Sequence, residues 1–168
     1  DYLYRHYASG NVKWEDLVAP AIALADEGFI LDESLPTSLA EGRRYLAKWP
    51  EASRIYLPDG KVPRPGDRFV NRDYAITLRA IQKGGADAFY KGPIAEKVVA
   101  AVKNHQTNPG GLTLDDLAGY AVKERPAVCA PYRGFSVCGM GPPSSGALTI
   151  GQILGTIEPG EKVVIKDN

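Results

Sequence analysis

The sequence contains few of the residues from which self-contained catalytic or metal centres are built. Its 168 residues include two cysteines, two histidines and one methionine. Two cysteines are too few for a disulfide framework or a zinc site. Neither a phosphate-binding glycine loop nor a metal-ligand spacing is present. The residues therefore give no indication of a metal site.

An excess of charge and long apolar runs are also missing. Lysine plus arginine and aspartate plus glutamate each number 20, so no nucleic-acid or anionic-membrane partner is indicated. No apolar run reaches the roughly 18 residues of a membrane-spanning helix. The opening stretch DYLYRHYASG does not have the form of a signal peptide and resembles the interior of a longer polypeptide. A length of 168 residues predicts a single domain, 1–168, with its own hydrophobic core.

Helical periodicity runs through the first two thirds of the chain. Apolar spacing predicts a turn at 13–18 and a helix over 19–27, because proline at position 20 is best tolerated near a helix start. A loop is predicted at 58–67, which has three prolines and two glycines. Further helices are predicted at 34–48, which Pro50 ends, at 72–83 behind an Asn71 cap, and as a short turn at 86–90. A helix that starts at Pro93 has a buried stripe of Ile94, Val98 and Val102, and a short helix follows a capping box of Thr113 and Asp116.

The composition changes after residue 120. Segment 126–140 is rich in strand-forming residues and contains the turn dipeptide Arg133–Gly134, which predicts a β-hairpin. A last helix is predicted over 145–157, with one apolar face formed by Ala147, Ile150, Leu154 and Ile157. The expected fold class is therefore α+β, mostly helical with a late β-hairpin.

A two-residue turn at Arg133–Gly134 sets a register in which Cys129 faces Cys138. Pairs alternate between hydrogen-bonded and non-hydrogen-bonded along such a ladder, and this register leaves Pro131 in a non-hydrogen-bonded pair, where it loses no ladder bond. Cys129 and Cys138 occupy the same kind of pair, whose Cα atoms lie about 4.5 Å apart. Two reduced, buried cysteines are the more common arrangement, and a cross-strand disulfide is the alternative. A Cα separation above about 7 Å would exclude the disulfide.

Ser144 and Ser145 lie between the hairpin and the last helix, where a hydrolase would place a nucleophile elbow. That elbow requires a Gly-x-Ser-x-Gly pattern and a histidine base. The pattern is absent, and the histidines are His6, near the start, and His105, beside a helix end. We expect one serine hydroxyl to cap the last helix. Such a helix start could offer N–H groups to an anion if it lay beside a site.

The remaining charged candidates have a structural interpretation. Asp115 and Asp116 lie in the first turn of a predicted helix, where carboxylates favourably oppose the macrodipole. Two arginine pairs could bind an acidic substrate but are expected to be surface charge: Arg43 with Arg44, and Arg64 with Arg68. The residues alone thus predict no self-sufficient active site, which is typical of a part of a larger enzyme.

Four blocks of the sequence carry a family resemblance. They are WEDLVAPAIALADEGFIL, GGADAFYKGPIAEKVVAAV, GGLTLDDLAGYAVKERPAV and YRGFSVCGMGPPSSGALTIGQIL. In this order and with matching gaps over residues 12–157, they resemble the large subunit of γ-glutamyltransferase (γ-glutamyltranspeptidase), ahead of its autocatalytic cleavage point. The PPSSG stretch at 142–146 is the most distinctive.

The resemblance implies an enzyme made as one precursor that cuts itself in two. The small subunit then begins with a threonine whose hydroxyl attacks the γ-glutamyl amide of glutathione and related compounds, while its free amine acts as base. Water or an acceptor amine releases the γ-glutamyl group. The implied fold is the four-layer αββα sandwich of N-terminal-nucleophile hydrolases, with no dissociable cofactor. The implied partner is the small subunit, and the implied location is periplasmic or secreted.

Several departures limit what the resemblance transfers. Ala147 stands where the family has a second glycine, which we expect to tighten the helix start. The chain ends before a cleavage threonine is expected, Thr149 and Thr156 lie inside the predicted last helix, and the arginine for the substrate carboxylate would precede the chain. No catalytic residue is therefore assigned, and the chain alone is predicted to be inactive. A structural joint near the cleft is predicted at Ser144, Ser145 and Gly146.

Two alternatives stay open at this point. One is another acylase of the same superfamily, such as a cephalosporin acylase or a poly-γ-glutamate-processing relative, which pocket residues outside this chain would distinguish. The other is a non-catalytic helical binding module. A fully closed polar surface would favour the module, and a large exposed apolar face would favour a part of a larger protein.

Overall fold

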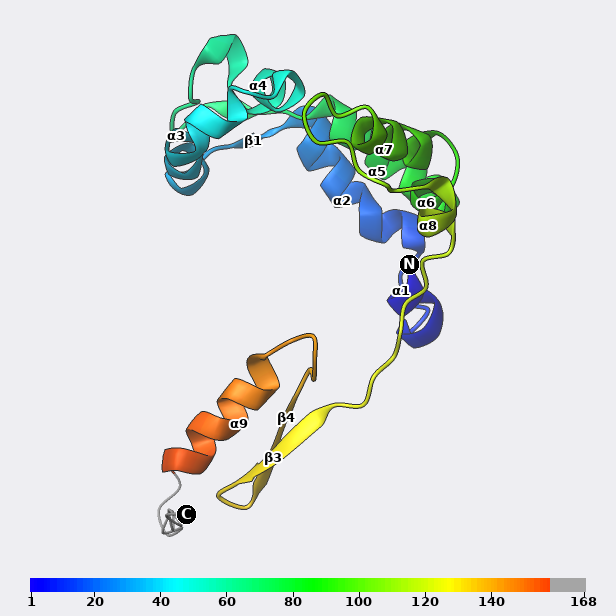
Figure 1. Ribbon diagram of the computed structural model, residues 1–168, viewed down its shortest axis with the longest axis vertical. Coiled ribbons are helices and arrows are strands. Elements are labelled where there is room, and N and C mark those ends of the chain that lie inside the picture. The colour runs from blue at the N-terminus through cyan, green and yellow to red at the C-terminus, as the bar shows by residue number, and fades with distance from the viewer. Residues whose placement is uncertain (158–168) are drawn as a thin grey trace. The chain divides into compact units, whose positions relative to one another are not determined.

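The computed structural model describes residues 1–157 and shows two compact units, Asp1–Tyr120 and Ala121–Asn168 (Figure 1). We call the first the helical unit and the described part of the second, residues 121–157, the hairpin unit. Length alone predicts one domain, whereas the structure has two units. The segment that joins their regular elements, residues 121–127, is exposed throughout and forms neither helix nor strand. Because no side chain of this segment is buried, the segment adds no packing to either unit.

The helical unit consists of short and medium helices and one pair of very short strands. Its elements are α1 (Tyr2–Tyr7), α2 (Trp14–Glu27), β1 (Phe29–Ile30), α3 (Ser34–Leu46), α4 (Pro50–Tyr56), the 3₁₀ turn η1 (Pro58–Gly60), β2 (Arg68–Phe69), α5 (Arg72–Gly84), α6 (Asp87–Tyr90), α7 (Pro93–Lys103) and α8 (Leu114–Ala118). The mostly helical character predicted from the sequence is confirmed.

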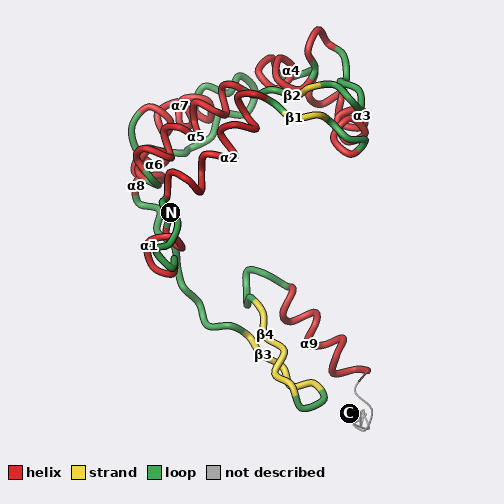
Figure 2. The backbone as a smooth tube through the Cα atoms, turned by 180° about the vertical axis from the view of Figure 1, so that it is seen from behind, coloured by secondary structure: helices red, strands yellow, loops and turns green. Residues whose placement is uncertain are grey.

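Helices α2 and α5 pack side by side and form the centre of the helical unit (Figure 2). The predicted start of α2 at residue 19 is wrong, because the helix begins at Trp14 and contains Pro20. Pro20 is exposed, so the carbonyl group that its missing N–H leaves unpaired can reach water. Two hydrogen bonds hold the first turn of α2 on α5: Trp14 Nε1 donates to the Ile81 carbonyl at 3.2 Å, and Gln82 Nε2 donates to the Glu15 carbonyl at 2.7 Å.

The predicted caps within the helical unit are confirmed. Asn71 accepts a hydrogen bond from the Tyr74 N–H at 3.0 Å and starts α5. Thr113 and Asp116 form a reciprocal capping box at α8. The buried stripe of α7 is displaced from the prediction, because the buried residues are Ala95 and Val99, while the predicted residues are only partly buried: Ile94, Val98 and Val102.

Two features of the helical unit were not predicted. Pro50 marks the end of the preceding helical pattern, but it also occupies the first turn of α4. Strands β1 and β2 pair antiparallel over two residues each, which is too short for a periodic signal. An edge-to-face contact of Phe29 with Phe69, with ring centroids 5.9 Å apart, accompanies this pairing. Tertiary contacts of this kind carry no local signature.

The hairpin unit contains β3 (Val128–Tyr132), β4 (Phe135–Gly139) and α9 (Gly146–Ile157). The predicted hairpin and its register are confirmed, since Tyr132 pairs with Phe135 and each earlier pair follows in step. Arg133 and Gly134 have φ angles of 48° and 81°, which suit a two-residue turn of type I′. The fold class is therefore α+β with a late hairpin, as predicted.

Helix α9 packs on both strands of the hairpin (Figure 2). The predicted contact face is correct only for Ala147 and Leu154, which are partly buried, because Ile150 and Ile157 are 50% and 56% exposed. Gly151 lies on the contact face in their place. A Cβ atom at Gly151 would lie 3.2 Å from Cβ of Ala130, so the glycine lets the helix approach β3 closely.

Candidate functional site

The joint that runs from the last residue of β4 to the first residue of α9, residues 139–146, is the sequence GMGPPSSG. Gly141 is buried, and a Cβ atom there would lie 2.8 Å from Cγ2 of Val128. A Cβ atom on Gly139 would lie 3.1 Å from Cβ of Ala147. The two glycines therefore allow the chain to leave the hairpin and enter the helix within van der Waals contact of both elements. The peptide bond between the two prolines of the joint is cis.

Both serines of the joint contribute to the start of α9. Ser144 donates its N–H to the Gly141 carbonyl at 3.1 Å, which closes a turn. The Ser144 hydroxyl accepts the N–H of Gly146 at 3.4 Å. The Ser145 carbonyl accepts the N–H of Thr149 at 2.9 Å, which is the first hydrogen bond of the helix. One serine thus binds through its hydroxyl and the other through its backbone.

The two histidines have local partners in the helical unit. The ring of His6 packs against Tyr2, with centroids 4.3 Å apart. His105 accepts the backbone N–H of Asn108 on Nδ1 at 3.0 Å, and its ring lies 5.0 Å from that of Trp49. These contacts place each imidazole in a structural role beside a helix end.

The two adjacent aspartates have unlike surroundings. The Asp116 carboxylate accepts hydrogen bonds from the backbone N–H of Thr113 at 2.8 Å and from its hydroxyl at 2.7 Å. The hydroxyl bond first, and the backbone bond second, lower the pKa of Asp116 below its ordinary value of 3.8. A general acid needs a raised pKa, so the structural interpretation of Asp116 is supported. The Asp115 carbonyl accepts the N–H of Gly119 at 2.8 Å.

The arginine candidates donate mainly to groups of the protein itself. Arg43 donates to the Gly60 carbonyl at 3.0 Å, and Arg44 donates to the Tyr45 hydroxyl at 2.7 Å. Arg68 donates to the carbonyls of Glu27 and Gly28 at 3.2 and 3.1 Å, and the backbone N–H of Arg64 donates to Asp67 at 2.7 Å. Carbonyl groups at the end of α2 are thereby satisfied.

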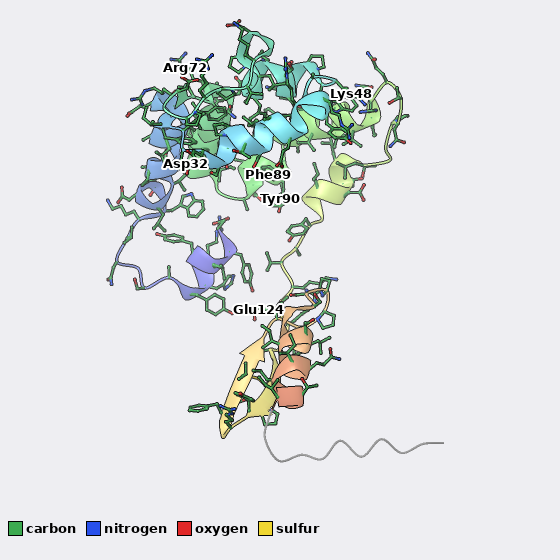
Figure 3. All side chains as sticks on the ribbon, turned by 90° about the vertical axis from the view of Figure 1, so that its left-hand side faces the viewer. Asp32, Lys48, Arg72, Phe89, Tyr90 and Glu124 are labelled. Carbon is green, nitrogen blue, oxygen red and sulfur yellow. A yellow bond between two sulfur atoms is a disulfide. The ribbon has the colours of Figure 1, made fainter. Side chains whose placement is uncertain are left out.

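A surface hollow of about 420 Å³ that the sequence did not predict lies between α4, β2 and the start of α5. Arg54 lines it and bonds to Asp73 at 2.6 Å and to Glu51 at 2.9 Å. The bond to Asp73 first, and the bond to Glu51 second, raise the pKa of Arg54. Arg72 also lines the hollow and is labelled in Figure 3. The charged residues that line the hollow are Arg54, Arg68, Arg72 and Asp73, so its lining has an excess of positive charge even though Arg54 is ion-paired.

The two cysteines are joined in a disulfide across the hairpin. Their Cα atoms lie 4.1 Å apart, well below the separation of about 7 Å that would exclude a bridge. Both cysteines are exposed, in contrast to the more common arrangement of two buried thiols. The hydroxyl oxygen of Ser136 lies 3.6 Å from Sγ of Cys138. The bridge therefore lies on the solvent-exposed face of the hairpin.

Residues 1–157 contain neither a cluster of metal-binding side chains nor a membrane-spanning helix. Over that range, no three histidine, cysteine, aspartate or glutamate side chains are grouped so that they could hold a metal ion. No helix within it combines the length and the apolar character needed to cross a bilayer.

Comparisons with known proteins give a consistent result. The profile of the family described as Gamma-glutamyltranspeptidase matches residues 1–164. A glutathione hydrolase proenzyme of Pseudomonas sp. (strain A14) is 36% identical over 159 residues, which cover 92% of this chain and 27% of the relative. An acylase ACY 1 proenzyme of Pseudomonas sp. (strain SE83) is 35% identical over 150 residues, covering 89% of this chain and 26% of the relative.

The fold is also similar to solved structures. The crystal structure of Helicobacter pylori gamma-glutamyltranspeptidase matches with a TM-score of 0.86 and 33% identity, covering 98% of this chain and 46% of that chain. The chain spans about a quarter of the length of the two curated relatives.

Proposed function

Since this chain belongs to the gamma-glutamyltranspeptidase family, we propose that it is an internal part of the large subunit of such an enzyme. The full enzyme hydrolyses or transfers the γ-glutamyl group of glutathione and related compounds. Its nucleophile is the N-terminal threonine of a small subunit, which is cut from the same precursor and lies outside this chain. The proenzyme names of two relatives support a precursor of this kind.

We propose that this chain supports the reaction but does not supply its nucleophile, and the main support for this is the hydrogen bonding at the start of α9. The Ser144 hydroxyl receives a helix amide, and the Ser145 carbonyl receives the first helical bond. Thr149 lies in the first turn of α9, and Thr156 Oγ1 donates to the Ile153 carbonyl at 2.7 Å. A threonine could become an N-terminal nucleophile only by cutting this helix. We therefore propose that Ser144, Ser145 and Gly146 form a structural joint near the cleft.

The exposed outer side of α9 supports a part of a larger protein over a free-standing binding module. Its apolar side chains are roughly half exposed: Leu148 at 47%, Ile150 at 50%, Ile153 at 54% and Ile157 at 56%. Apolar side chains gathered on one helix in this way are typical of a surface that another segment covers. In the proposed enzyme, the covering segments belong to the remainder of the same precursor.

The disulfide supports a periplasmic or secreted location for the proposed enzyme. Disulfides persist in oxidising compartments and are reduced in the cytosol of most cells. The Cys129–Cys138 bridge is exposed, so cytosolic thiols would reach it readily. We infer that the chain works in an oxidising compartment, where the closed bridge is the prevailing state.

An acylase of the ACY 1 type is the second candidate function. The relative of that name is 35% identical to this chain, against 36% for the glutathione hydrolase, so the matched segment does not separate the two activities. The amide that is cleaved differs between them, whereas the framing segment is shared. The choice therefore depends on pocket residues elsewhere in the protein.

Segment exchange tests the proposal. Residues 1–164 of this chain replace the matching segment of the Pseudomonas glutathione hydrolase proenzyme, and cleavage into two subunits is followed together with turnover of a γ-glutamyl anilide. We expect the chimera to cleave itself and to turn over the anilide. Gly141→Val in the chimera should reduce both readouts, because its side chain would collide with Val128. The matched change Gly155→Ala, at a glycine with open space around it, should leave both unchanged.

Two outcomes would contradict the proposal. Turnover of the anilide by the isolated 168-residue chain, lost on Ser145→Ala, would place a nucleophile in this chain. A chimera that stays uncleaved in the glutathione hydrolase but cleaves itself in the ACY 1 proenzyme would favour the acylase.

A further inference from the structure

The Cys129–Cys138 bridge is exposed, and one of its two sulfur atoms, that of Cys138, lies beside a serine hydroxyl. Both cysteines are exposed, and they face each other across β3 and β4. Ser136 lies two residues before Cys138 on the same face of β4, and its hydroxyl is 3.6 Å from that sulfur. Exposed disulfides are the ones that exchange with small thiols, because the attacking thiolate must reach a sulfur atom in line with the S–S bond.

We propose that Cys129–Cys138 is a thiol-exchange site, which low-molecular-weight thiols of the glutathione class open and small disulfides close again. This role is independent of the reaction that the full enzyme catalyses. It gives the hairpin unit two covalent states, one with the bridge and one with two thiols.

The direction of attack follows from the position of Ser136. A small thiolate attacks Sγ of Cys129, the S–S bond breaks, and Cys138 leaves as a thiolate that then takes a proton from water. The Ser136 hydroxyl can donate to the departing Cys138 sulfur and stabilise its negative charge. A second small thiolate then attacks the sulfur of the small thiol that is bound to Cys129. It releases the Cys129 thiol, so that two small thiols become one small disulfide and the bridge gains two electrons and two protons.

Opening the bridge would act on the joint that follows it. Cys138 is followed directly by Gly139, which lies against Ala147 at the start of α9. A two-stranded hairpin by itself is only marginally stable in water, so without the bridge its strand ends separate more often. The register of β3 and β4, which positions the start of the joint, then depends only on packing against α9.

The test uses the full oxidised chain with mixtures of reduced and oxidised glutathione as the probe. Samples are quenched with acid, free thiols are alkylated, and mass spectrometry locates the adducts. We expect reversible opening, with the transient glutathione adduct on Cys129. Ser136→Ala should slow opening by roughly threefold or more, because the departing thiolate loses its hydrogen-bond donor. The matched change Ser38→Ala, at an exposed serine of α3, should leave the rate unchanged.

Three results would overturn the proposal. The bridge could stay closed in buffers that open it in the urea-unfolded chain, which would show that the folded hairpin protects it. The adduct could form mainly on Cys138. Ser136→Ala could leave the rate at that of the Ser38→Ala control while circular dichroism shows both variants folded, in which case the hydroxyl does not assist the leaving sulfur.

Discussion

The helical unit and the hairpin unit are stabilised by different means. Within residues 1–157, the apolar side chains that are buried all belong to the helical unit: Ile22, Ala25, Leu31, Pro36, Leu39, Leu57, Ala75, Ala95 and Val99. The hairpin unit has one buried residue, Gly141, and it has the disulfide. A small unit cannot enclose many side chains, so close backbone approach and a covalent bridge take the place of a core.

The largest effect should come from the core of the helical unit. Leu57 is 2% exposed, and Leu57→Ala should lower the free energy of unfolding of this unit by about 3 kcal/mol through lost burial and a cavity. Hydrogen exchange of helical-unit peptides measures the change. Leu3→Ala, at a side chain 73% exposed, is the control and should cost less than about 0.5 kcal/mol. Similar losses for both variants would mean that the helical unit has no defined core.

Removing the bridge should give the next largest effect, in the hairpin unit. The double change Cys129→Ser and Cys138→Ser opens a loop with a sequence separation of 9, which should cost about 2–3 kcal/mol. Exchange of amides in β3 and β4 should rise accordingly. Reducing agent should produce the same rise in the unaltered chain and no further rise in the double variant. Unchanged protection after reduction would show that packing on α9 is sufficient.

Acid should loosen the start of α8 through Asp116. Hydrogen bonds from Thr113 lower the pKa of this carboxyl in the folded state, so its contribution to stability is complete above the ordinary value of 3.8. That contribution is lost as the pH falls through the lowered folded value. Exchange of the Thr113 amide between pH 2 and pH 6 should therefore show a transition below about pH 4, which Asp116→Asn removes. Asp115→Asn is the matched control, and a transition that survives Asp116→Asn would contradict the assignment.

The smallest effect should separate the two serines of the joint. Ser144→Ala removes a long hydrogen bond of 3.4 Å to the first amide of α9 and should cost about 0.5 kcal/mol. Ser145→Ala keeps the backbone carbonyl that accepts from Thr149 and should cost close to nothing. Exchange of the α9 amides measures both variants. A larger loss for Ser145→Ala would mean that its hydroxyl has a contact beyond the helix start.

The predictions succeeded where the deciding interactions are local in the sequence. Turn chemistry at Arg133–Gly134 determined the register of the hairpin, and the register brought the two cysteines opposite each other. Asn71 and the Thr113–Asp116 box determined where α5 and α8 begin. Each of these depends on groups within a few residues of one another, so propensity and spacing contain the necessary information.

The predictions failed where a distant segment supplies the stabilising contact. Trp14, at the start of α2, donates to the Ile81 carbonyl of α5, and this contact with a distant segment stabilises the turn ahead of Pro20. Strands β1 and β2 exist because they pair with each other across intervening helices. The contact face of α9 shifted toward Gly151 because β3 lies close enough to need a residue without a side chain.

The sequence by itself determined the helix caps of α5 and α8, the hairpin register that places the two cysteines opposite each other, and the family resemblance, since these follow from residue types at short, fixed spacings. The tertiary structure decided that the two cysteines are bridged. Only the tertiary structure decided how the serines are used, which sides of α7 and α9 are buried, and that the bridge is exposed. The physical reason is that burial and hydrogen-bond partners are set by which segments meet in space. A chain segment cannot specify this from its own periodicity.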